Sequence, residues 1–185
     1  MKTLIVYYSL TGKTKTLAEY MAKNIDANLV ELEEISKLSK IGAFTKGVFM
    51  SIFRRPSYTM PINEDISIYQ RVVIASPIWA GFPSPAIYDF ISKYALNDKE
   101  IYGLLSCSGS PKNANKLFRQ ELKKLKLDCK SVLTIKTDNG LMDALKNNTV
   151  KFSLDCNDKI IMTRNTHNDL DKSVENIDFN SDNNI

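Results

Sequence analysis

A hydroxyl-rich hexapeptide, residues 9–14 (Ser-Leu-Thr-Gly-Lys-Thr), lies between a short apolar run and a segment with helical spacing. Where a strand passes into a helix, free backbone N–H groups and the helix dipole favour an anion such as a phosphate. The hydroxyl groups of Ser9, Thr11 and Thr14 add donors, and Gly12 allows close approach of the backbone. The hexapeptide therefore predicts phosphate binding. The alternative is an ordinary capped helix start.

Two other kinds of phosphate loop share part of this outline, and both lack required glycines here. A P-loop needs a glycine five residues before Gly12, where this chain has Tyr7. The dinucleotide fingerprint Gly-x-Gly-x-x-Gly also fails, because Gly12 is the only glycine before Gly42. Neither a nucleoside triphosphatase nor a classical dinucleotide-binding protein is expected.

Two further segments have a composition suited to ligand contact. Residues 77–85 hold three prolines, Gly81 and the only tryptophan, Trp79, which predicts a loop with few allowed shapes. Residues 106–110 are small and polar. Each segment follows an apolar run that resembles a buried strand. Parallel strands end at one edge of a sheet, so the three loops are expected to meet there.

Strands and helices are expected to alternate along the chain. The expected strands are residues 4–8, 29–32, 71–76, 101–106 and 132–135, and the expected helices are 17–25, 44–53, 87–94 and 114–125. Parallel strands need helical crossovers, so this alternation predicts an α/β fold with a doubly wound parallel sheet and helices on both faces.

The pattern weakens after Asp138. Residues 141–146 support only a short helix, and residues 150–156 and 159–162 indicate a hairpin, with a poorly formed helix as the competing interpretation. We expect a domain over 1–137, an irregular C-terminal extension over 138–165 and a flexible tail over 166–185. Without a long last helix, a second subunit could be needed to cover the sheet.

The composition is that of an ordinary soluble globular protein. The 185 residues are 43% hydrophobic and 25% charged, and we find neither a membrane-spanning run nor a signal peptide, so a cytoplasmic protein is expected. The three cysteines are far apart and there is a single histidine, which argues against a disulfide framework or a metal site.

The net charge of +4 comes with two basic clusters, one at Lys46, Arg54 and Arg55 and one within residues 123–130. These clusters could meet an acidic partner or a phosphate-bearing ligand, but solvated helix faces are the simpler interpretation. No aromatic residue interleaves the second cluster, so nucleic-acid binding is not expected.

The first two loops resemble those of the flavodoxin family. That family has a phosphate loop of the form Ser/Thr-x-Thr-Gly-x-Thr after a strand ending in an aromatic, which residues 7–14 match, with Ala18 four residues further on. Residues 76–81, with Pro83 and Pro85, resemble the flavin-ring loop of small single-domain flavodoxins. The resemblance covers residues 1–136. It implies FMN as cofactor and a five-stranded sheet in the order 2-1-3-4-5.

The resemblance also implies roles for individual residues. The FMN phosphate would be held by backbone and hydroxyl groups, with the Lys13 side chain directed to solvent; these residues are Ser9, Thr11, Gly12, Lys13 and Thr14. The backbone of the second loop would run along the flavin ring, at Pro77, Ile78, Trp79, Ala80 and Gly81. The third loop would line the other flank of the ring, at Ser106, Cys107, Ser108 and Gly109.

Two of these residues have alternative roles. Trp79 would lie against or beside the ring, or it could serve plain packing. Cys107 could be redox-active, but nothing in its surroundings indicates a lowered thiol pKa, and a small residue is needed wherever the backbone approaches a ring.

Two departures from the family bear on function. Short-chain flavodoxins are usually strongly acidic, whereas this chain has a pI of about 8.8. Residues 107–110 also lack the aromatic lid usual in that loop. The leading interpretation is an FMN-binding redox protein that transfers electrons through the flavin, itself the group that carries the chemistry.

The alternatives are an NAD(P)H-dependent FMN or quinone reductase and a flavin-free binding module that kept the fold. The expected partner is a redox protein or NAD(P)H, with a homodimer as a further option, and no membrane or nucleic acid is expected to bind.

Overall fold

The computed structural model describes residues 1–35, 58–111, 113–154 and 159–164. The expected helix over 44–53, the cluster of Lys46, Arg54 and Arg55 and the tail over 166–185 lie outside these residues. Within the described ranges, every helix is too short or too polar to cross a membrane.

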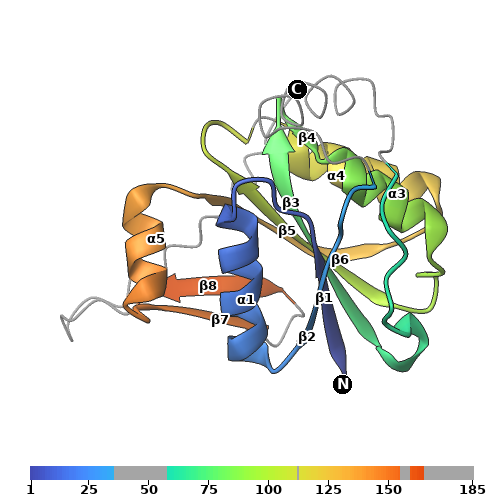
Figure 1. The fold of residues 1–185 in the computed structure, drawn as a ribbon, viewed down its shortest axis with the longest axis horizontal. Helices are drawn as coiled ribbons and strands as arrows, with labels where there is room; N and C mark the ends of the chain where they lie inside the picture. The colour runs from blue at the N-terminus through green and yellow to red at the C-terminus, as the bar shows by residue number, and fades with distance from the viewer. Residues whose placement is uncertain (36–57, 112, 155–158, 165–185) are drawn as a thin grey trace.

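Five parallel strands form the centre of the molecule (Figure 1). They are β1 (Thr3–Tyr7), β2 (Asn28–Glu31), β3 (Arg71–Trp79), β5 (Glu100–Cys107) and β6 (Cys129–Lys136). Their order is β2-β1-β3-β5-β6, which confirms the expected order 2-1-3-4-5 because β4 is only a two-residue strand beside the end of β3. Val72, Val73 and Ile74 are fully buried, as expected of a parallel strand covered on both faces.

The second loop differs from its prediction. β3 continues through Pro77 to Trp79, and β4 (Phe82–Pro83) turns back to pair with it, Trp79 lying opposite Phe82. Ala80 and Gly81 form the turn with φ values of 52° and 91°. Two-residue hairpin turns favour positive φ, which glycine adopts freely and alanine only at a cost. The proline-restricted loop predicted here is thus the tip of a short hairpin.

Helices cover the two faces of the sheet in separate layers (Figure 1). One face packs against α3 (Pro85–Lys93) and α4 (Ala114–Lys124). The other packs against α1 (Lys13–Ile25), α5 (Asn139–Lys146) and the hairpin of β7 (Val150–Leu154) and β8 (Ile160–Arg164). A single turn of 3-10 helix, η1 (Ile66–Ile68), precedes β3.

The predicted hairpin after α5 is confirmed, with Phe152 opposite Met162. Phe152 and Ile160 are buried in the same cluster as Leu17 of α1. β7 is also fixed to α1 by two polar contacts: Tyr20 Oη donates to the Val150 carbonyl (2.6 Å), and Phe152 N–H donates to Asn24 Oδ1 (2.8 Å). The hairpin therefore covers the face left open by the short α5. The need to cover the sheet therefore no longer supports the predicted homodimer, which stays a prediction.

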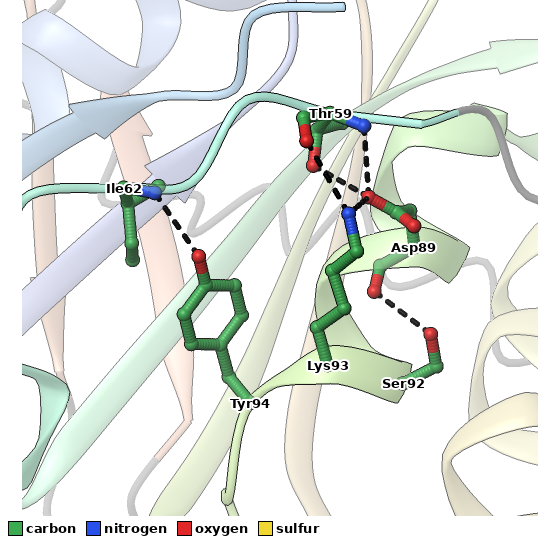
Figure 2. Close-up of polar contacts among 6 residues, drawn as sticks. All are labelled: Thr59, Ile62, Asp89, Ser92, Lys93 and Tyr94. Carbon is green, nitrogen blue, oxygen red and sulfur yellow. Dashed lines mark hydrogen bonds and ion pairs between the residues drawn. The ribbon is translucent and has the colours of Figure 1, made fainter.

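A buried carboxylate on α3 fixes the segment that leads into η1 and β3 (Figure 2). Asp89 Oδ2 accepts from Thr59 N–H (2.9 Å), Thr59 Oγ1 (2.6 Å) and Lys93 Nζ (2.6 Å). The Tyr94 hydroxyl accepts from Ile62 N–H at 3.0 Å. Burial alone would raise the pKa of Asp89, but the hydrogen bonds from Lys93 and Thr59 outweigh it and hold this pKa below its ordinary value.

Candidate functional site

The three predicted loops meet at the carboxyl edge of the sheet. β1, β3 and β5 are adjacent, so the segments that follow them leave from neighbouring positions. The ring of Tyr8 meets that of Trp79 edge-on, with centroids 5.8 Å apart. Thr14 Oγ1 lies 2.8 Å from Ser106 Oγ. Direct contacts thus join the first loop to each of the other two.

The first loop leaves the start of α1 without a side-chain cap. Gly12 stands at the N-cap with φ 87°, and its N–H donates to Ser9 Oγ at 3.1 Å. A Cβ added at Gly12 would meet nothing within 4 Å, so glycine is needed here for its conformation rather than for space. The first N–H groups of a helix have no intrahelical acceptor. With the exposed Thr11 beside them, they form a donor set suited to an anion.

Thr14 and Ser106 connect the loops rather than face outward. Their residues are only 2% and 3% exposed, and their hydroxyl groups hydrogen-bond to one another. This arrangement does not support a contact between a ligand and the side chain of either residue. The backbone N–H of Thr14, in the first turn of α1, remains part of the donor set.

The prediction for Lys13 was a side chain directed to solvent. In the structure this side chain instead contacts other parts of the chain. Lys13 Nζ donates to the Thr137 carbonyl at 3.0 Å and lies 3.4 Å from Ser108 Oγ. Thr137 in turn donates through its N–H (2.7 Å) and its hydroxyl (3.1 Å) to the Cys107 carbonyl. Thr137 was not among the predicted site residues, because no local motif marks it.

The second loop buries its tryptophan. Trp79 is 6% exposed and packs against Tyr8, which agrees with the packing alternative for its side chain. Pro77 and Ile78 are half-buried, Gly81 is buried, and Ala80 is exposed at the turn. The exposed residue of this hairpin is therefore Ala80, at its turn.

Tyr8 is a further residue at this edge, which the sequence marked only as part of the motif before the first loop and without a role of its own. Burial, together with the adjacent Glu34 carboxylate, raises the pKa of the Tyr8 phenol above its ordinary range. The phenol therefore stays neutral at physiological pH.

The third loop has a buried start and an exposed tip. Cys107 is buried, and burial raises the pKa of its thiol despite the opposing charge of Lys136. A protonated thiol is a poor nucleophile, so the structural interpretation of Cys107 is favoured. Ser108 and Gly109 are exposed. This flank of the site is small and polar.

Comparisons with known proteins show the fold. No protein-family model and no curated protein matches the chain. Among solved structures, a candidate flavoprotein from Bacteroides eggerthii has a TM-score of 0.64 at 20% identity, covering 80% of this chain and 96% of its own. A flavoprotein from Lactobacillus acidophilus, solved in complex with FMN, has a TM-score of 0.60 at 22% identity, covering 78% and 98%. The chain therefore has a flavodoxin-like fold, as its loops indicated.

Proposed function

We propose that this chain binds FMN and transfers electrons through the bound flavin. The observation that carries the proposal is the uncapped start of α1 behind the left-handed Gly12, located where β1, β3 and β5 end together. Open sheets of this type bind ligands at that edge, and a helix start is suited to a phosphate. The FMN-bound flavoprotein with the same fold supports this choice of ligand.

The described residues fit the two halves of FMN. The first N–H groups of α1, those of Lys13 and Thr14 among them, and the Thr11 hydroxyl would hold the phosphate. The exposed residues Ala80, Ser108 and Gly109 would present backbone groups to the flat ring. When bound, FMN supplies one- and two-electron chemistry, and the protein supplies position and electrostatics.

The visible spectrum of the purified protein, before and after FMN is added, tests this proposal. Trp79 is the only tryptophan and lies at the proposed site, so its fluorescence should be quenched as FMN binds. We expect saturable quenching together with a bound-flavin spectrum. A colourless protein that neither binds added FMN nor changes its fluorescence would favour the flavin-free binding module.

A reductase that uses NAD(P)H is the second candidate. The tip of the third loop, Ser108, Gly109 and Ser110, is exposed and has no aromatic side chain to cover one face of the ring. An open face would let a nicotinamide stack for hydride transfer, whereas a carrier would exchange electrons with a redox partner protein. Anaerobic addition of NADPH separates the two: rapid bleaching without another protein indicates the reductase.

A further inference from the structure

Lys13 carries a positive charge that no described carboxylate matches. Its ammonium group contacts the Thr137 carbonyl and the Ser108 hydroxyl, both neutral. Lys15, two residues further along α1, instead pairs with Glu31 at 3.0 Å. Within the described part of the chain, Lys13 thus differs from Lys15 in having no carboxylate partner, so its charge is available to a ligand.

The ammonium group of Lys13 is also held on one side of the proposed site. The hydrogen bond to Thr137 links residues 124 positions apart and places the ammonium group at the ends of β5 and β6. Lys136, the last residue of β6, lies in register with Cys107 and acts on its thiol with a second positive charge. The partly positive start of α1 adds to both. This flank of the site is therefore suited to negative charge.

We propose that Lys13 stabilises the negative charge that two-electron reduction places on the flavin ring. This inference rests on the proposed binding of FMN. Hydride transfer from a nicotinamide would deliver two electrons and one proton to the neutral ring and leave an oxidised nicotinamide. The reduced ring then carries one negative charge unless it binds a second proton. Ser108, which Lys13 contacts, belongs to the loop expected to flank that ring.

The phosphate is the other anion that Lys13 could meet. The uncapped start of α1 already offers N–H donors to the phosphate, whereas the Lys13 side chain contacts Thr137 and Ser108 of the third loop's flank. The geometry therefore favours the ring. A cation near the ring stabilises the anionic reduced flavin more than the neutral oxidised flavin. This difference raises the reduction potential of the flavin and favours two-electron chemistry.

The test is a redox titration of the FMN-loaded protein, with Lys13→Gln compared with Lys15→Gln. Glutamine keeps a hydrogen-bond donor and removes the charge. We expect Lys13→Gln to bind oxidised FMN as the parent does and reduced FMN about tenfold more weakly, which lowers the two-electron potential by about 30 mV. Lys15→Gln should leave the potential unchanged, and Lys13→Arg should restore most of it.

The same variants distinguish the competing roles. If Lys13→Gln weakens both redox states of FMN equally and leaves riboflavin binding unchanged, Lys13 contacts the phosphate and the inference is wrong. Equal shifts in Lys13→Gln and Lys15→Gln would also overturn it. Lys136→Gln, at an exposed position, should lower the potential in the same direction by less. A parent protein that binds no FMN would instead overturn the proposed function.

Discussion

Two lysines at opposite ends of their helices fix neighbouring segments in different ways. Lys93, in the last turn of α3, donates to the buried Asp89 carboxylate and to the Thr59 carbonyl. Lys13, at the start of α1, contacts a carbonyl and a hydroxyl but no carboxylate among the residues that the structure describes. The first cation is paired with a carboxylate, and the second has no such partner in the described ranges. One arrangement is a closed structural clamp, whereas the other leaves charge available to a ligand.

The largest effect is expected from breaking the closed clamp. Asp89→Ala removes the acceptor of the buried Thr59 N–H and hydroxyl, and we expect a loss of about 3 kcal/mol in the free energy of unfolding. Asp89→Asn keeps an acceptor and should cost about 1 kcal/mol. Urea denaturation of the three proteins measures this difference. Equal stability of Asp89→Ala and the parent would mean that the clamp contributes nothing.

Thr11 tests the open side of the comparison. Thr11→Val removes an exposed hydroxyl from the proposed phosphate site and should weaken FMN by about 1 to 2 kcal/mol, with much less effect on riboflavin. Titrations monitored by Trp79 fluorescence provide both constants. Equal losses for the two ligands would contradict a phosphate role.

Gly12 tests the conformation that opens this site. Gly12→Ala forces an L-residue to adopt φ 87°, which should cost about 1 kcal/mol of stability although the added methyl meets open space. Gly109→Ala is the matched control, since a Cβ there also meets nothing within 4 Å and its φ lies outside the left-handed region. Thermal unfolding of both variants should show a loss only in the first.

Acid titration yields the smallest effect and also concerns the clamp. The pKa of Asp89 is lower in the folded protein than its ordinary value of about 3.9. Its ionisation therefore stabilises the fold fully above that value, and the contribution is lost as the pH falls through the lower, folded pKa. The stability difference between the parent and Asp89→Asn should shrink as the pH falls from 5 to about 2. A difference that stays constant would contradict the lowered pKa.

The sequence predicted the features that local patterns encode. The continuous apolar run over residues 71–76 indicated a strand buried on both faces, and the pattern over residues 150–156 and 159–162 indicated the hairpin. The strand–loop–helix order around Gly12 identified the edge at which the site lies. Each of these signals extends over only a few residues.

Other features depend on contacts between distant parts of the chain. Lys13 meets Thr137 across 124 positions, and Thr14 meets Ser106 across 92, so neither partner could be read from spacing. The turn after Trp79 was missed because alanine is an unusual residue at positive φ. The Trp79 ring packs edge-on against Tyr8, which comes from the end of another strand.

The two side chains of α1 that hydrogen-bond to β7 also bear on the self-association of the protein. A strand at the margin of a sheet offers unpaired N–H and C=O groups to which a strand of a second molecule can add. Here Asn24 and Tyr20 occupy such groups of Phe152 and Val150. Replacing Asn24 by alanine would expose the Phe152 N–H, and light scattering of concentrated protein should detect the added self-association before any change in flavin binding.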